Sequence, residues 1–326
     1  MPNAEPPLIP VIAGPTAGGK TGLAIRCAKL AEAEGRTPHA AVISADAFQV
    51  YRGLDIASAK PTMDEREGVP HHLIDIVEPS EPFTVAQWLE RATKAIEEIE
   101  ASGGWPIIAG GTHLYIKALI DGLFEGPPAD EVLRDELRAM PAAERRAELE
   151  RVDPKAAARI HPADERRTVR ALEVFRLTGT PISDYQSQWD SGSNPLADRL
   201  LLVTLHWETD AINRRINSRV KAMVEAGLVE ETRRLLDSGN LGPQAAQALG
   251  TKQIAEALRD QSQSGLSLED AIERTKIETR RFAKNQRTWL RRLAAGPGER
   301  PRKLPIHPEG KDAATLAQTV VQQCFC

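Results

Sequence analysis

The stretch GPTAGGKT, residues 14–21, decides the fold of this chain, because it fits the P-loop pattern G-x-x-x-x-G-K-[ST]. It follows a short apolar run, Leu8 to Ala13, and precedes an expected helix from Lys20 to about Ala33. In that setting, successive backbone N–H groups and a helix N-terminus bind phosphate oxygens. The motif therefore predicts a polyphosphate site made by Gly14, Pro15, Thr16, Ala17, Gly18, Gly19, Lys20 and Thr21.

Two side chains of this motif carry chemistry of their own. We expect Lys20 to bridge the outer phosphates and the Thr21 hydroxyl to ligate Mg²⁺. The motif does not say which polyphosphate is bound.

Two further apolar runs predict buried strands, residues 40–44 (AAVIS) and 105–109 (WPIIA). Helical patterns separate the runs, and one of them opens with the capping-box pair Thr84 and Gln87. Strands alternating with helices indicate a parallel sheet covered on both faces, with ligands at the carboxyl ends of its strands. The P-loop, Asp46 and the turn 110–112 all follow such strands, so we expect them to converge.

The alternation stops from about Asp121 to Asn194, where helical patterns follow one another, and a buried strand resumes at residues 200–205. We therefore predict an α/β fold with a P-loop NTPase-like parallel core, residues 1–120 and 197–326, and a helical insertion, residues 121–196. The C-terminal part reads as helices, including a long one through residues 272–293. The final residues, 324–326, are expected to form a mobile tail.

The composition is that of an ordinary soluble enzyme, with 41% hydrophobic and 27% charged residues in 326. No apolar run approaches the roughly 18 residues of a membrane span, and the first residues do not resemble a secretory signal. The three cysteines lack zinc-site spacing, which favours a reducing, cytoplasmic location. A net charge of −4 argues against a protein that coats nucleic acid, although it can hide local basic patches.

Asp46 stands directly after the second strand and allows three interpretations. It could be a magnesium carboxylate, a general base near the transferred group, or an aspartate that caps a loop. Position alone does not choose among them.

The basic tract 276–292 contains one acid, Glu278. Five of its cations recur at helical spacing and form a stripe, Lys276, Arg280, Lys284, Arg287 and Arg291. Such a stripe is usually a solvated helix face, but contact with phosphates of a nucleic acid is the alternative. Phe282 and Trp289, a heptad apart, are expected in the core. A second basic cluster, Arg166, Arg167 and Arg170, lies in the predicted insertion.

Several long motifs in one order resemble the bacterial tRNA dimethylallyltransferases, also called tRNA isopentenyltransferases. Beyond the P-loop they are residues 44–61 (SADAFQVYRGLDIASAKP), 70–79 (PHHLIDIVEP), 109–119 (AGGTHLYIKAL), 152–174 (VDPKAAARIHPADERRTVRALEV) and 280–291 (RRFAKNQRTWLR). The resemblance spans about residues 9–293. It implies transfer of a dimethylallyl group from dimethylallyl pyrophosphate to N6 of adenine 37 in tRNA, by a monomer that uses Mg²⁺.

The resemblance also implies roles for individual residues. Thr16, Lys20 and Thr21 match residues that hold pyrophosphate and magnesium, Asp46 matches the general base, and Arg219 matches an arginine that steadies the departing pyrophosphate. Because a stacked base cannot react, the adenine is expected to flip out of the anticodon loop. Residues matching tRNA contacts or sites near the target base are Asp46, Ala47, Phe48, Gln49, Thr112, Arg134, Arg166, Arg167, Arg170, Lys252, Arg280, Arg281, Lys284 and Arg287.

Four residues, at three places in the chain, depart from the family pattern. Ala47 stands where serine is usual, Ala57-Ser58 replaces Gly-Thr, and Thr251 replaces an aromatic residue, which puts one tRNA contact in doubt.

Two rival functions share the P-loop. A small-molecule kinase would transfer phosphate from ATP, but it leaves the two basic clusters unexplained. A non-catalytic RNA-binding protein would not need Lys20, Thr21 and Asp46 intact.

Overall fold

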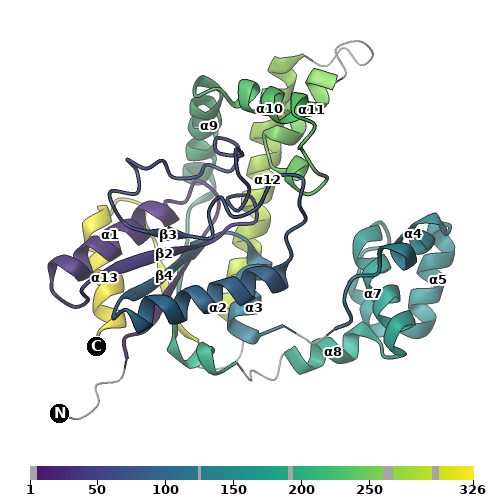
Figure 1. The fold of residues 1–326 in the computed structure, drawn as a ribbon, viewed down its shortest axis with the longest axis horizontal. Coiled ribbons are helices and arrows are strands. Elements are labelled where there is room, and N and C mark those ends of the chain that lie inside the picture. The colour runs from purple at the N-terminus through teal and green to yellow at the C-terminus, as the bar shows by residue number, and fades with distance from the viewer. Residues whose placement is uncertain (1–5, 124–125, 190–193, 260–266, 296–300) are drawn as a thin grey trace. The chain divides into compact units, whose positions relative to one another are not determined.

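A computed structural model of the chain describes residues 6–123, 126–189, 194–259, 267–295 and 301–326. Within these residues, six strands form one sheet in which every pair is parallel, in the order β3-β2-β4-β1-β5-β6. Figure 1 labels β3, β2 and β4 of this sheet. The predicted parallel sheet is thus confirmed. The strands are β1 (Ile9–Ala13), β2 (Ala40–Ala45), β3 (His71–His72), β4 (Trp105–Gly110), β5 (Leu200–Leu205) and β6 (Arg302–Ile306).

The P-loop strand β1 lies in the middle of the sheet, between β4 and β5. Its alternate residues enter two separate cores, because successive side chains of a strand point to opposite faces. Val11 joins the core beneath α2 (Val85–Ala101) and α3 (His113–Asp121), whereas Ile12 joins the core beneath α1 (Lys20–Ala33) and α13 (Ala313–Cys324). Burial on both faces explains why the central strands read as continuous apolar runs.

The C-terminal segment differs from the sequence-based expectation. Residues 324–326 were expected to be mobile, but Cys324 is buried and the Leu8 N–H donates a hydrogen bond to its carbonyl. The Phe325 ring lies 4.8 Å from that of Trp105. The prediction was wrong because α13 buries an apolar face against α1 and so anchors the end of the chain.

Strand β6 carries Pro305, and a proline is tolerated there because β6 is an edge strand.

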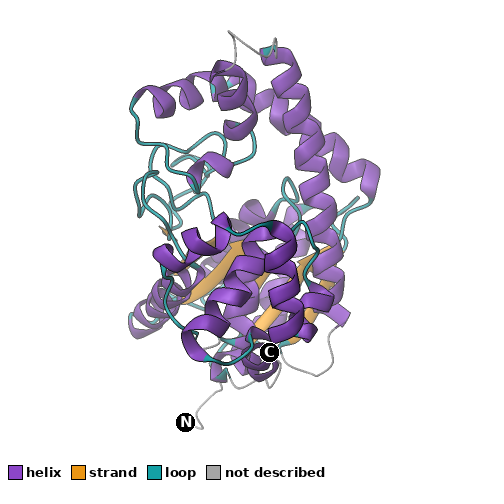
Figure 2. Ribbon diagram, turned by 90° about the vertical axis from the view of Figure 1, so that its right-hand side faces the viewer, coloured by secondary structure: helices purple, strands orange, loops and turns teal. Residues whose placement is uncertain are grey.

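Four more helices accompany the sheet, and Figure 2 shows the longest of them running past it. They are α9 (Thr209–Glu225), α10 (Leu228–Asp237), α11 (Thr251–Arg259) and α12 (Leu268–Ala295). The predicted long C-terminal helix is therefore confirmed as α12. Across the part of the chain that the structure describes, no helix combines the length and apolar character needed to cross a membrane.

The chain separates into two compact units, the core unit of residues 1–120 with 195–326 and the helical unit of residues Asp121–Asn194. The second unit has its own apolar core, which includes Leu137, Leu149 and Leu172. Its helices are α4 (Glu131–Ala139), α5 (Ala142–Val152), α6 (Pro154–Arg159), α7 (Glu165–Thr178) and α8 (Ile182–Trp189).

Candidate functional site

The P-loop leaves β1 and enters α1 through two residues with left-handed backbone conformations, Ala17 (φ 59°) and Gly19 (φ 85°). Glycine adopts this conformation at no steric cost, but alanine is strained there, and such strain is typical of ligand-binding loops. The carbonyl of Pro15 accepts hydrogen bonds from the Gly18 N–H at 3.0 Å and from Lys20 Nζ at 2.9 Å. The loop is therefore closed on itself, with the lysine folded over it.

Two side chains beyond the motif hold the loop from outside. Arg215 Nε donates to the Ala17 carbonyl at 2.8 Å, and Trp207 Nε1 donates to the Gly18 carbonyl at 3.1 Å. The Arg215 guanidinium also lies over the Trp207 ring, 4.7 Å from its centroid. These two bonds engage carbonyl oxygens of the loop and none of its N–H groups, which are the donors that bind anions in such loops. The P-loop pattern gave no indication of either residue.

Positive charge is concentrated beside the loop. Burial and the neighbouring Arg219 lower the pKa of Lys20 to about 8, against an opposing effect of Asp46. Burial likewise lowers the pKa of Arg219, again opposed by Asp46 and by Glu65. With a pKa of about 8, Lys20 is mostly protonated at neutral pH, and with Arg219 it offers an anion-binding pair in a partly desolvated place.

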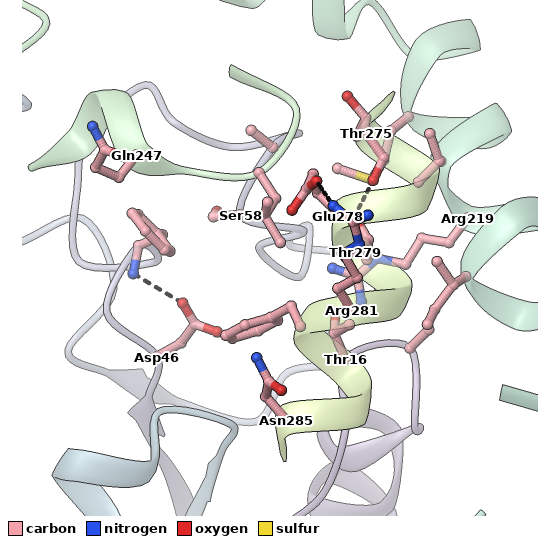
Figure 3. A pocket seen from close by; sticks show the side chains of 18 residues that line it. Thr16, Asp46, Ser58, Arg219, Gln247, Thr275, Glu278, Thr279, Arg281 and Asn285 are labelled. Carbon is pink, nitrogen blue, oxygen red and sulfur yellow. Dashed lines mark hydrogen bonds and ion pairs between the residues drawn. The ribbon is translucent and has the colours of Figure 1, made fainter. Parts of the chain in front are cut away.

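A cavity of about 380 Å³ lies in the core unit, between the P-loop, the segment after β2, and helices α9 and α12 (Figure 3). Its lining combines polar and apolar residues, so it suits an anionic group joined to a hydrophobic one. The polar residues are Thr16, Asp46, Ser58, Arg219, Gln247, Thr275, Glu278, Thr279, Arg281 and Asn285. The apolar residues are Ala17, Phe48, Ala57, Ile216, Val220, Met223, Leu249 and Phe282.

Asp46 follows β2 directly and lines this cavity. Its Oδ1 accepts hydrogen bonds from the N–H groups of Phe48 at 2.9 Å and Gln49 at 3.4 Å. Asp46 therefore caps the loop and also faces the cavity, so the loop-capping and functional interpretations are compatible. Its Oδ2 accepts no hydrogen bond from the residues that the structure describes and is available to a ligand.

The residues around Asp46 are fixed by neighbouring elements. The Ala47 N–H donates to the Thr112 hydroxyl at 2.9 Å, so Thr112 joins the turn after β4 to the segment after β2. Glu231 of α10, only 1% exposed, accepts from the N–H groups of residues 55, 56 and 57 at 2.7–3.0 Å. This buried carboxylate, which the motifs do not reveal, holds the stretch that brings Ala57 and Ser58 to the cavity.

The basic stripe lies along α12 and is partly paired with α9. Arg280 donates to Asn217 Oδ1 at 2.6 Å and Arg287 donates to Thr209 Oγ1 at 2.9 Å, while Lys284 is exposed. Arg281 is exposed, pairs with Glu278 at 2.6 Å, and lines the cavity. These basic residues all belong to α12, the helix that borders the cavity.

Phe282 departs from the expectation for α12. It was expected in the core with Trp289, but its side chain is 41% exposed and lines the cavity. Trp289 does pack on the core and stacks on His113 at 4.3 Å between ring centroids. The prediction failed for Phe282 because α12 extends beyond the sheet, so one helix face passes from core to cavity.

Thr251, which stands in place of an aromatic residue, is fully buried at the start of α11. The next residue, Lys252, is exposed.

The helical unit holds four of the predicted RNA contacts. Glu173, fully buried, pairs with Arg134 at 2.9 Å and with Arg170 at 2.6 Å. Both arginines are thus fixed by a buried carboxylate, which also raises the pKa of Arg134 against the effect of burial. Arg166 and Arg167 are exposed on α7, with Arg167 at 3.4 Å from Asp164.

Comparisons with known proteins agree on one family. A model of the IPP transferase family matches residues 49–293. A tRNA dimethylallyltransferase of Geobacillus kaustophilus strain HTA426 is 47% identical over 289 residues, which are 87% of each chain.

Solved structures give the same result. A tRNA isopentenylpyrophosphate transferase from Bacillus halodurans is similar with a TM-score of 0.67 and 38% identity, over 97% of this chain and 94% of that one. A eukaryotic dimethylallyltransferase acting on tRNA is similar with a TM-score of 0.71 and 30% identity, over 86% of this chain and 69% of that one.

Proposed function

We infer that this chain, which belongs to the IPP transferase family, transfers a dimethylallyl group from dimethylallyl pyrophosphate to N6 of adenine 37 in tRNA. The products are N6-isopentenyladenosine and pyrophosphate. The observation that carries this inference is one cavity that joins a P-loop, an aspartate and an apolar wall. A kinase needs the first of these, but an apolar wall beside the phosphate site suits a prenyl group.

In the proposed reaction, the bond from C1 of the allylic group to the pyrophosphate oxygen breaks, and a bond from C1 to adenine N6 forms. The developing allylic cation is delocalised, so the main requirement is to stabilise pyrophosphate as it leaves. Lys20, Arg219 and the loop N–H groups are arranged for that purpose, since fixed cations and dipoles in a desolvated site stabilise developing charge strongly. The free Oδ2 of Asp46 would accept the proton that N6 loses.

Magnesium is part of the proposal through Thr21. This residue is in the first turn of α1, and its hydroxyl has no hydrogen-bond partner among the described residues. Within those residues no cluster of three His, Cys, Asp or Glu side chains could hold a metal by itself. Thr21 would therefore share the ion with phosphate oxygens and water. When bound, Mg²⁺ neutralises charge on the pyrophosphate.

The function can be tested by mass spectrometry of nucleosides from tRNA incubated with the purified protein. Dimethylallyl pyrophosphate should give N6-isopentenyladenosine, and ATP in its place should give neither a prenylated nucleoside nor phosphate transfer. Phosphate transfer from ATP without prenylation would support the kinase, and tRNA binding without any product would support a non-catalytic binder.

We propose that the stripe on α12 and the cations of the helical unit bind tRNA phosphates, and that the protein acts as a monomer. For the stripe this gives a prediction. Arg280→Ala with Lys284→Ala should weaken tRNA binding and lower the logarithmic salt slope by about 0.7–0.9 per lost contact, because fewer counterions are released. Binding is measured as a function of salt concentration, and affinity for dimethylallyl pyrophosphate should not change.

A matched control is Arg26→Ala with Lys29→Ala, which removes two cations from α1 instead. An equal loss of slope in both double variants would mean that only net charge matters. No loss in either would show that the stripe is a solvated helix face.

A further inference from the structure

Gln286 of α12 makes two hydrogen bonds to the functional edge of the sheet, although no motif role is attached to it. Its Oε1 accepts from the Thr16 N–H at 2.7 Å, and its Nε2 donates to the Gly111 carbonyl at 3.0 Å. The side chain is 2% exposed. A single amide therefore joins α12 to the P-loop and to the turn after β4, partners separated from it by 270 and 175 residues.

The amide of Gln286 packs closely against Gly111. A Cβ atom on Gly111 would lie 2.6 Å from Nε2 of Gln286 and 3.5 Å from Nζ of Lys20. A methyl group at position 111 would therefore displace this amide. One turn further along α12, the stacking of Trp289 on His113 makes a second contact with the segment after β4.

The opposite side of α12 carries exposed cations. Lys284 is two residues from Gln286, which places it about 200° around the helix. It is exposed, as is Arg281, whereas Gln286 is buried. One continuous helix therefore presents basic side chains outward and an amide inward to the loop.

We propose that Gln286 is a positioning residue, which holds the P-loop and the turn after β4 in register with α12. RNA bound to the outer side of the helix and pyrophosphate bound in the loop are then held at a fixed distance from each other. This rests on the proposed function. Gln286 acts through the Thr16 N–H and the Gly111 carbonyl, without touching the reacting atoms. A misplacement of about 1 Å can lower a rate about 10²-fold, so loss of this one amide is expected to lower the rate of prenyl transfer strongly.

The test uses Gln286→Met, which keeps length and volume but removes both hydrogen bonds. We expect kcat for prenyl transfer to fall at least about tenfold, while the KM for tRNA stays within about threefold. Magnesium pyrophosphate, the probe for the loop, should bind at least about threefold more weakly without tRNA.

The control is Gln244→Met. Gln244 also bridges distant segments, accepting from the Phe83 N–H at 3.1 Å and donating to the Phe83 carbonyl at 2.8 Å, but it does not line the cavity. It should lower the melting temperature while leaving kcat and pyrophosphate binding unchanged. Gly111→Ala should reproduce the kinetic effect of Gln286→Met, since its methyl group displaces the same amide.

Two results would overturn the proposal. One is a Gln286→Met protein with wild-type kcat and pyrophosphate affinity, and the other is a loss of kcat that the Gln244→Met control shows equally. Failure of the proposed function would look different. The wild-type protein would then bind no pyrophosphate and transfer no prenyl group, and the role of Gln286 would fall with it.

Discussion

Lys20→Ala should lower prenyl transfer to tRNA by about 10²–10³-fold, the loss expected when one preorganised group facing developing charge is removed. Lys20 Nζ lies over the P-loop, 2.9 Å from the Pro15 carbonyl, and shares its surroundings with Arg219. Arg219 lines the cavity from a different element, α9 (Figure 3), so it is not expected to take the place of the loop's own lysine. Single-turnover rates with saturating tRNA measure the effect on the chemical step.

The pH dependence supplies an internal check on this role. Because the pKa of Lys20 is lowered to about 8, its positive charge is present below that pH and is lost as pH rises through it. Affinity of the free enzyme for magnesium pyrophosphate should therefore weaken above pH 8. The same titration of Lys20→Ala shows how much of the pH dependence comes from ionisation of the ligand itself.

A suitable control is Lys29→Ala, which removes an exposed lysine of the same helix, paired with Glu67 at 2.8 Å. It should transfer prenyl groups at the wild-type rate. Transfer by Lys20→Ala within a few-fold of wild type would refute the assignment of the P-loop to pyrophosphate.

Asp46→Asn should lower the rate of transfer by about 10²–10⁴-fold if Asp46 is the general base. The change keeps size and retains an oxygen that can accept the Phe48 N–H, so the loop should keep its shape. Binding of tRNA and of magnesium pyrophosphate should then change little. The measurement is a single-turnover rate at saturating substrates over a range of Mg²⁺ concentrations.

The magnesium titration separates the two functional roles of Asp46. A rate that stays low at saturating Mg²⁺ supports the base. Rescue by excess Mg²⁺ would instead show that Asp46 is mainly a metal ligand, and would contradict our assignment. Asp64→Asn, a change in the same segment outside the residues that line the cavity, is the control and should behave as wild type.

The sequence by itself determined the parallel core and the place of the P-loop. Apolar runs such as residues 105–109 and 200–205 are local signals, because a strand buried on both faces consists mostly of apolar residues. A strand end followed by glycines or aspartate then locates the functional edge, since parallel strands end together. This is how Asp46 and Lys20 could be assigned to one site before the structure was known.

Only the tertiary structure decided which side chains support that site. Gln286 and Glu231 are polar residues in helices, and their partners lie on segments more than 170 residues away, so no local pattern identifies those partners. The only signal for Gln286 is a polar residue in step with the buried Ala283 and Leu290. Phe282 was misassigned for the related reason that periodicity shows which helix face is apolar, but not whether that face meets a core or a cavity.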